Sequence, residues 1–373
     1  MGGYASHFPI TENPMNTTFP KLLSLALSLC LLLSCILLPS CAGRTPKPEK
    51  YSAYSFDYFD TVTTVTGYAE SQAAFDEVAN AVLAELEAYH RLFTIYHRFD
   101  GLENLCTVNE LVDGQHRVVT VDRPIIDLLL YAKEMYTTTD GRVNIAMGSV
   151  LSIWHDYRTL GMADPAAAEL PPVDTLQAAA LHTDINCLVI DEEASTVHIT
   201  DPGMRLDVGA VAKGYAVEMA ARSLEEKGIT GYVLNVGGNV RTVGSKADGE
   251  AWIVGIENSA DDEERPYLAY LGLSGSSLVT SGSYQRYYFV DGKKYHHIID
   301  PETLMPSEGF TSVSILTKNS ADGDALSTAL FCMSYEEGLA LIESLPDTEA
   351  MWVFSDGREM TSSGFDSHRK DPK

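Results

Sequence analysis

Apolar residues recur along this chain with the spacings that distinguish helices from strands. Over Ser71–Phe93 they fall at three- and four-residue steps, which predicts an amphipathic helix. Pro124–Tyr136 and Ala210–Lys227 are predicted as further helices, because a proline suits the first turn of one and Gly228 is a usual stop for the other. A last helix is expected from about Asp324 to Leu345.

Shorter stretches rich in β-branched and aromatic residues predict strands. A strand pair is expected within Tyr54–Tyr68, and Cys187–Ile190 with Thr196–Ile199 should form a hairpin. The later strand signals are Tyr232–Val236, Trp252–Ile256, Tyr287–Val290, Tyr295–Ile299, Ser312–Leu316 and, last, Met351–Phe354. Strands and helices mixed without strict alternation favour an α+β fold with mixed sheets and packed helices. We expect a single large domain over residues 51–373, with two fused lobes as the alternative.

The first 41 residues have the pattern of a targeting signal. Lys21 precedes an almost unbroken apolar run, Leu22–Leu38, which ends in Leu38-Pro39-Ser40-Cys41. A basic residue, an apolar stretch and a small residue before the cut are typical of a secretory signal. A cysteine directly after that small residue resembles the bacterial lipobox, in which the thiol receives a lipid and becomes the mature N-terminus. We therefore predict lipidation at Cys41, a linker over residues 42–50, and a protein anchored on the extracytoplasmic face of the cell membrane.

Other interpretations of this segment stay open. Leu33-Ser34-Cys35 is a second possible lipobox, but apolar residues follow Cys35, whereas polar residues follow Cys41. A plain signal anchor, or an ordinary cleaved signal with a coincidental cysteine, would leave the chain without a lipid.

The charge balance restricts the partners. The chain has 26 Lys and Arg against 52 Asp and Glu, a net charge of −26. Such a surface repels phosphate backbones and anionic headgroups, which argues against nucleic acid as a partner and against a polybasic membrane anchor. A polyanionic ligand would therefore need a metal ion or a few cations close to it. The cysteines left after the signal, Cys106, Cys187 and Cys332, are odd in number and scattered, which predicts small core residues and no disulfide framework or zinc site.

Leu206–Tyr215 is the first segment with candidate chemistry. It is predicted as a strand that ends at Gly209 and opens a helix with Lys213 in its first turn. Unpaired backbone N–H groups and the helix dipole favour a phosphate at such a place. The spacing is not that of a Walker A loop, and tight helix–sheet packing would require the same small residues.

Two further segments offer a histidine pair and a metal-type pair. In a strand, His296 and His297 would point to opposite faces, so only one could face a given pocket, and a structural role is the commoner case. Asp324 and Thr328 are four residues apart and share one face of a helix. A carboxylate and a hydroxyl at that spacing suit Mg²⁺, although an N-cap aspartate with a back-bonded threonine is the alternative.

Two stretches are rich in turn formers. Thr280–Tyr284 has no GxSxG elbow around Ser281, so we expect a loop that contacts a ligand through its backbone, or a plain turn. Gly237-Gly238-Asn239 is predicted to be a strand end with close backbone approach, or a bulge.

Taken together and in this order, these segments resemble the FAD:protein FMN transferase family, the ApbE-type lipoproteins. The likeness extends from Tyr58 to about Gly364. The segments that carry it are Phe59-Asp60-Thr61, Leu92–Tyr96 with Asn104 and Asn109, Gly141–Asn144 followed by Trp154, Leu206–Tyr215, Asn235–Asn239, Thr280–Tyr284, His297–Pro301, and Asp324-Ala325 with Thr328-Ala329. Each is short, but eight in the right order behind a lipobox are highly specific.

The resemblance implies an ApbE-like, T-fold-related fold and roles for individual residues. His297 matches the family's essential histidine. Asp324 and Thr328 match side chains that bind Mg²⁺, and Ala210 matches a residue that offers its carbonyl. Contacts with FAD are implied for Tyr96, Arg142, Val143, Asn144, Asp207, Lys213 and Ile298.

Two motifs depart from the family pattern. Many members have Met-Gly-Thr where this chain has Phe59-Asp60-Thr61, and Gly-Ala-Phe-Asp where it has Gly141-Arg142-Val143-Asn144. The second departure would let Arg142 add a phosphate contact.

The implied reaction is Mg²⁺-dependent transfer of FMN from FAD to a Ser or Thr hydroxyl of an acceptor, with release of AMP. The acceptor would be an exported or membrane-bound protein of a redox system. His297 would act as a base or stabilise the leaving phosphate, and positioning and electrostatics would supply most of the catalysis. The alternatives are an FAD pyrophosphatase, with water as the acceptor, and a non-catalytic flavin-binding lipoprotein.

Overall fold

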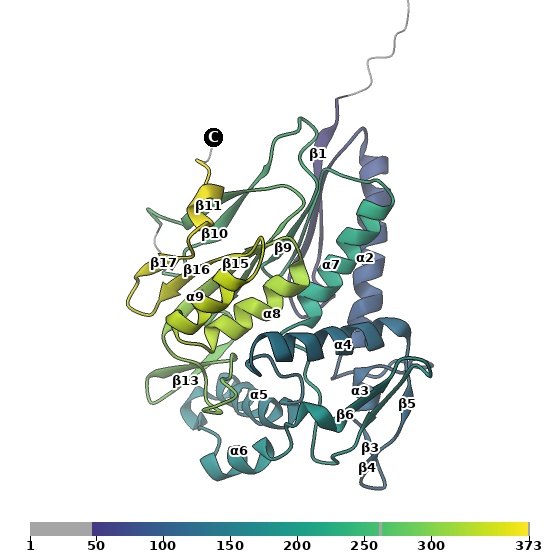
Figure 1. Cartoon of the computed structure of the whole chain (residues 1–373), viewed down its shortest axis with the longest axis vertical. Helices are drawn as coiled ribbons and strands as arrows, with labels where there is room; N and C mark the ends of the chain where they lie inside the picture. The colour runs from purple at the N-terminus through teal and green to yellow at the C-terminus, as the bar shows by residue number, and fades with distance from the viewer. Residues whose placement is uncertain (1–46, 261–262, 372–373) are drawn as a thin grey trace, which may run out of the picture. The chain divides into compact units, whose positions relative to one another are not determined.

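An eight-stranded antiparallel sheet is the framework of the computed structural model, which describes residues 47–260 and 263–371 (Figure 1). Its strand order is β1-β2-β8-β9-β12-β15-β16-β17, so strands far apart in the chain pair side by side. The strands are β1 (Glu49–Ser55), β2 (Thr63–Ala69), β8 (Tyr232–Val236), β9 (Asn239–Val243), β12 (Ser277–Gly282), β15 (Phe310–Thr317), β16 (Glu349–Phe354) and β17 (Glu359–Thr361).

Four helices pack on one face of this sheet: α2 (Gln72–Phe93), α7 (Ala212–Glu226), α8 (Ser320–Phe331) and α9 (Tyr335–Ser344). The predicted apolar stripe of α2 is buried, with Phe75 and Leu86 fully enclosed. Ser71 caps this helix by accepting a hydrogen bond from the N–H of Ala74, as its position before the apolar stripe indicates.

The other face of the sheet is covered by a hairpin of β10 (Trp252–Glu257) and β11 (Tyr267–Leu273). Because side chains alternate along a strand, neighbours in β15 enter different cores. Ile315 packs under the helices, whereas Leu316 joins Leu271 and Phe365 under the hairpin.

A second lobe contains most of residues 94–210 and lies below the sheet in Figure 1. Its helices are α3 (Leu105–Val108), α4 (Arg123–Thr138), α5 (Gly148–Ala163) and α6 (Val173–Ala180). Its strands are β3 (Leu111–Val112), β4 (Gln115–His116), β5 (Val119–Thr120), β6 (Leu188–Asp191) and β7 (Thr196–Ile199). Short 3-10 turns occur at Pro165–Ala167, Ile185–Cys187 and, near the C-terminus, Phe365–His368. The hairpin of β13 (Tyr287–Val290) and β14 (Lys293–His296) packs against α5.

The predicted α+β class is confirmed, and several boundaries are wrong. The helix expected over Asp324–Leu345 is two helices, because Ser334 starts α9 with a capping box that includes Glu337. The strand expected before Gly209 is an extended loop without a sheet partner along Leu206–Val208. The strand expected over Tyr295–Ile299 ends at His296.

Other differences concern elements that the pattern did not predict. Thr280–Gly282 is the end of β12 and not a loop, and β17 follows the strand expected to be last. The helices α3, α5 and α6 and the strands β3, β4, β5, β9 and β11 were not predicted. Tight turns and short apolar runs carry too little periodicity to distinguish them from loops.

The predicted N-terminal signal, including Cys41, lies outside the described residues. The first strand begins at Glu49, so it takes in the last two residues of the expected linker. Within residues 47–260 and 263–371, no helix combines the length and apolarity needed to span a bilayer. Cys332 is buried as predicted, whereas Cys106 and Cys187 are only partly buried, and all three thiols are free.

Candidate functional site

One cavity of about 290 Å³ lies between the sheet lobe and the second lobe. Its wall combines the end of α2, residues 142–158, the loop before α7, the β8–β9 turn, the end of β12, residues 297–299 and one face of α8. Every residue predicted to contact FAD or Mg²⁺ lines this cavity: Tyr96, Arg142, Val143, Asn144, Asp207, Ala210, Lys213, His297, Ile298, Asp324 and Thr328. The fold therefore brings together residues that are up to 232 positions apart in the chain.

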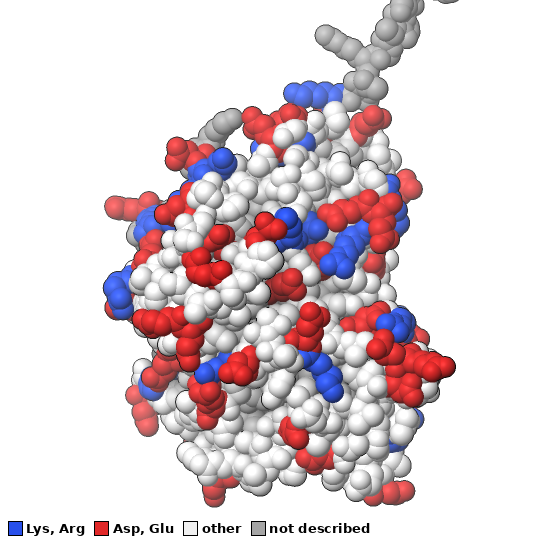
Figure 2. Space-filling view, viewed as in Figure 1, with Lys and Arg blue, Asp and Glu red and all other residues white. Residues whose placement is uncertain are grey.

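The charge of the cavity contrasts with that of the protein surface. Asp and Glu side chains are spread over the face seen in Figure 2, in keeping with the net charge of −26. The cavity wall instead includes four basic residues, Arg142, Arg158, Lys213 and Arg286, which outnumber its three aspartates, Asp60, Asp207 and Asp324. An anion can thus be bound locally in an acidic protein, as the composition led us to expect.

Gly214 allows α7 and α8 to approach closely at one end of the cavity. A Cβ at this position would lie 2.4 Å from the Cβ of Asp324 and 2.4 Å from the carbonyl oxygen of Ser320. The backbone N–H of Gly214 donates to Oδ2 of Asp324 over 2.8 Å, and Lys213 Nζ lies 3.2 Å from Oδ1. The Asp324 side chain, which is only 4% exposed, is held in place by α7.

The oxygen atoms at this end of the cavity fit a hard divalent cation. Thr328 follows Asp324 by one turn of α8, and Ala210 lies in the loop that leads into α7. Among the described residues, no three His, Cys, Asp or Glu side chains cluster as in a metal site built from protein side chains alone. One carboxylate, one hydroxyl and one carbonyl leave positions for water and phosphate oxygens, which is the coordination that Mg²⁺ prefers. The N-cap alternative for Asp324 is wrong, because α8 begins at Ser320 and Asn319 is its N-cap.

The two adjacent histidines have different surroundings. Nδ1 of His296 accepts from the N–H of Ile298 over 3.2 Å, which leaves Nε2 to donate to the carbonyl of Ser307 at 2.7 Å. His296 is buried, and its ring lies 5.5 Å from that of Phe331. His297 lines the cavity, as the family resemblance implied, and His296 borders the second cavity. The strand alternation expected to separate the two side chains is wrong, because β14 ends at His296.

His297 is neutral near pH 7. Burial, followed by the charges of Arg286 and Arg158 and smaller effects of His296 and Lys213, lowers its pKa to about 3. Its Nδ1 is buried and has no hydrogen-bond partner among the described residues. A neutral imidazole with a free nitrogen can accept a proton, and an anion bound nearby would raise its pKa.

The other residues predicted to contact FAD differ in which groups they have free to bind a ligand. Tyr96 is 54% exposed at the cavity and presents a ring that can stack on a planar group. Oδ1 of Asp207 accepts from the N–H of Gly209 over 2.9 Å, and burial raises the pKa of this carboxyl group. The Asn144 amide is already engaged, because it donates to the carbonyl of Thr183 and accepts from the N–H of Ala146.

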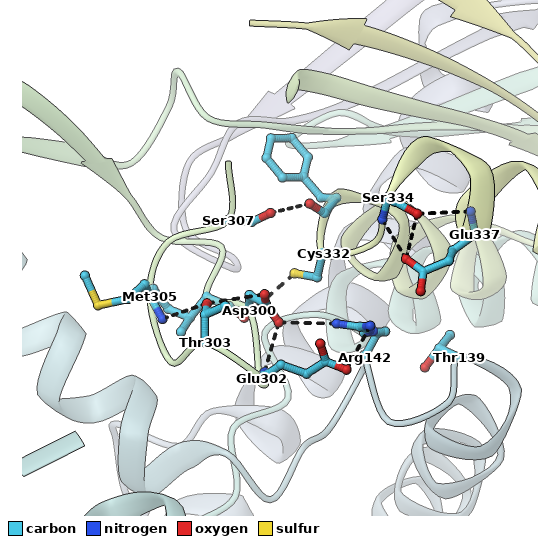
Figure 3. Close-up of polar contacts among 12 residues, drawn as sticks. Thr139, Arg142, Asp300, Glu302, Thr303, Met305, Ser307, Cys332, Ser334 and Glu337 are labelled. Carbon is cyan, nitrogen blue, oxygen red and sulfur yellow. Dashed lines mark hydrogen bonds and ion pairs between the residues drawn. The ribbon is translucent and has the colours of Figure 1, made fainter. Parts of the chain in front are cut away.

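Arg142 is also engaged by neighbouring groups. Figure 3 shows its guanidinium against two carboxylates, 3.5 Å from Asp300 Oδ1 and 2.9 Å from Glu302 Oε1. It borders a second cavity of about 580 Å³, whose wall includes His296. Its charge is therefore largely compensated, which weakens the expectation that it adds a phosphate contact.

The sequence reasoning did not single out Arg158 and Arg286, and it named Asn239 only as part of a turn and a family motif, without a role in the cavity. Arg158 lies on α5, Arg286 in the loop between β12 and β13, and Asn239 at the start of β9. Asn239 is 1% exposed, and its amide nitrogen has no partner among the described residues. The sequence signal for Asn239 was its place directly after the two glycines of the β8–β9 turn. Glycines at a strand end indicate that a ligand or another backbone segment approaches closely, and a polar side chain beside them can contact it.

Comparison with known proteins shows to which family the chain belongs. The model of the ApbE family matches residues 59–352. The chain belongs to the ApbE family. This confirms the resemblance drawn from the short motifs, and the match includes every predicted FAD and Mg²⁺ residue.

Curated and solved relatives extend the likeness over most of the chain. FAD:protein FMN transferase of Klebsiella pneumoniae (strain 342) is 32% identical over 272 residues, which cover 70% of this chain and 81% of that protein. The protein of the same name from Treponema pallidum (strain Nichols) is 31% identical over 349 residues, which cover 89% and 92%. The crystal structure of the ApbE protein of Thermotoga maritima matches with a TM-score of 0.73 and 26% identity, covering 87% of this chain and all of that chain. The fold of this chain is thus the ApbE fold.

Proposed function

We propose that this protein transfers FMN from FAD to a Ser or Thr hydroxyl of an acceptor protein, with a phosphoester formed and AMP released. The observation that carries the proposal is a single cavity that combines basic side chains, an oxygen-ligand set and a neutral histidine. The names of the curated relatives in the ApbE family support the same reaction.

The diphosphate of FAD would lie at the α7–α8 end of the cavity. Asp324, Thr328 and the carbonyl of Ala210 would hold Mg²⁺, which offsets the negative charge of the diphosphate and polarises its oxygens. Lys213 lies within 3.2 Å of Asp324 and supplies a further positive charge there. Tyr96, at the exposed side of the cavity, would stack on one of the two ring systems.

The chemical step places a hydroxyl group of the acceptor beside His297. The oxygen of that hydroxyl forms a bond to the FMN-side phosphorus, and its proton passes to the neutral imidazole. The bond between this phosphorus and the bridging oxygen breaks, and the electron pair leaves with AMP. The low pKa makes His297 a weak base by itself, and the negative charge of the bound diphosphate would raise that pKa towards the working range.

The same cavity would serve two other functions if its acceptor differed. Water in place of the hydroxyl would give an FAD pyrophosphatase that releases FMN and AMP. Without a reactive acceptor, the protein would bind flavin only.

One experiment separates these functions. The purified protein is incubated with FAD, Mg²⁺ and a candidate acceptor from an exported redox system. Flavin fluorescence that stays with the acceptor on a denaturing gel, with one AMP per flavin attached, supports transfer. AMP without attached flavin indicates hydrolysis, and neither product indicates binding alone; either result would overturn the proposal.

We also propose that the protein acts at the extracytoplasmic face of the cell membrane, anchored by a lipid on Cys41. The proposal rests on the apolar run Leu22–Leu38, the lipobox-like residues up to Cys41 and the polar stretch after them. Its acceptor would then be an exported or membrane-bound protein, and nucleic acid is disfavoured by the net charge of −26.

A further inference from the structure

Two arginines of the cavity, Arg158 and Arg286, form no ion pair with a carboxylate of the described residues. Arg158 contacts Nδ1 of His155 over 3.1 Å, and Arg286 donates to the backbone carbonyl of Asp60 over 3.3 Å. Within the described part of the chain, neither guanidinium forms an ion pair. This contrasts with Lys213, which is paired with Asp324 in the same cavity.

The two arginines line the same cavity, where their charges act on one another. Burial and the charge of Arg286 lower the pKa of Arg158, even though Asp207 acts in the other direction. Burial raises the pKa of the Asp207 carboxyl group, while the nearby charges of His155, Arg158 and Arg205 act in the other direction. The two like charges therefore repel each other in a partly enclosed space, and an anion between them would relieve this cost.

The position of the pair relative to His297 indicates which anion this is. Arg286 and Arg158 are the two charges that act most strongly on His297, ahead of Lys213. Nδ1 of His297 also has no hydrogen-bond partner among the described residues. His297 and the two arginines can therefore each still form a hydrogen bond to a bound ligand. Guanidinium groups bind phosphate oxygens through two parallel hydrogen bonds, which also fix the orientation of the phosphate.

We infer that Arg158 and Arg286 form an anion-binding pair that holds the FMN-side phosphate of the dinucleotide against His297. The diphosphate then lies between two groups of cations, this pair at one end and Lys213 with the metal ligands at the other. The inference rests on the proposed function for the identity of the substrate. It adds two substrate-binding residues, one of them on a helix that the sequence pattern did not predict.

The test compares FAD, which carries a diphosphate, with riboflavin, which carries no phosphate. FAD and riboflavin are titrated into the full-length protein, and Kd is measured from the flavin fluorescence. In Arg286→Gln and Arg158→Gln, we expect FAD affinity to fall at least tenfold and riboflavin affinity to change less than twofold. Arg286→Lys should recover part of the loss, since it restores charge without the bidentate geometry. Arg123→Gln, which removes one exposed charge paired with Asp127, is the matched control and should leave both affinities unchanged.

A second readout follows the titration of His297. The charged and titratable groups that act on it are Arg286, Arg158, His296 and Lys213, and all lower its pKa. Removal of Arg286 therefore raises that pKa, and the acid limb of the pH–rate profile for transfer should move to higher pH. A purely structural role of Arg286 would lower the rate without moving this limb.

These measurements test the role of the two arginines in FAD binding separately from the transfer reaction. FAD affinity that is unchanged in both glutamine variants overturns it, as does an equal loss of FAD and riboflavin, which would indicate misfolding of the cavity. Because Arg286 lies in an exposed loop, its variant should fold even if Arg158→Gln does not, and thermal melts check this. If the wild-type protein binds FAD but attaches no flavin, the proposed function fails while the affinity ratios still decide the role of the arginines.

Discussion

Alanine substitution of the two adjacent histidines should separate catalysis from stability. His297 faces the cavity with Nδ1 unpartnered among the described residues, whereas His296 has both ring nitrogens in hydrogen bonds. We predict that His297→Ala lowers FMN transfer at least about a hundredfold, the usual contribution of an acid–base group. That loss corresponds to about 2.7 kcal/mol in the barrier. FAD affinity should change far less, because the basic side chains and metal ligands remain.

His296→Ala should have the reverse effect. It removes two hydrogen bonds of about 1 kcal/mol each and the packing against Phe331, for a loss of about 3 kcal/mol in unfolding free energy. For a domain of this size the melting temperature should fall by roughly 4–5 °C. Transfer per folded molecule should stay close to that of the wild type. His297→Ala should unfold within a few degrees of the wild type, because its Nδ1 makes no hydrogen bond to the described residues.

The assays are single-turnover transfer below the melting temperature of both variants and thermal unfolding followed by circular dichroism. His297→Gln serves as a second variant, since it preserves most of the side-chain volume and removes the base. The reasoning is refuted if both alanine variants lose transfer equally at matched folded concentration, or if His296→Ala loses more. Either result would mean that the imidazole acting on the phosphate is not that of His297.

Three further predictions address the metal site, the pH dependence of stability and the lipid. Asp324→Ala should abolish transfer, because a carboxylate contributes more to holding a hard cation than a hydroxyl does. Thr328→Ala should retain a residual activity that higher Mg²⁺ increases. Full activity of Asp324→Ala in the presence of a chelator would exclude the metal site. Burial lowers the pKa of four histidines, His90, His116, His296 and His297. Their unfolded forms gain a proton first as the pH falls below about 6.5, so the unfolding free energy should decrease below that pH, as denaturant titrations between pH 8 and 5 can check; a stability that rises on acidification would contradict this. Cys41→Ala should release the protein from membranes or leave its precursor unprocessed, and unchanged labelling with a radioactive fatty acid would point to Cys35 instead.

Two predicted helices, α2 and the one expected after Asp324, show what a local pattern of residues can and cannot predict. The helix α2 was predictable because twenty-two residues carry a regular apolar stripe behind a capping serine, and such a signal needs no knowledge of partners. The single helix expected after Asp324 was wrong because Ser334 and Glu337 form a capping box inside an otherwise apolar run. Local hydrogen bonds of that kind are visible in sequence, but whether they end a helix depends on what the neighbouring turns pack against.

For the site, the sequence by itself determined the family and a set of residues that all line one cavity, because several short motifs in a fixed order are specific even though each is weak. Only the tertiary structure decided how those residues are used. Arg142 was expected to face a phosphate and is paired with Asp300 and Glu302, whereas Arg158 and Arg286 were not singled out and have no such partner among the described residues. The charge state of His297 depends first on its burial and then on those two arginines, which lie 139 and 11 positions from it in the chain. Pairing and burial arise from contacts between distant segments, and electrostatic interactions act through space, so neither can be read from the order of residues along the chain.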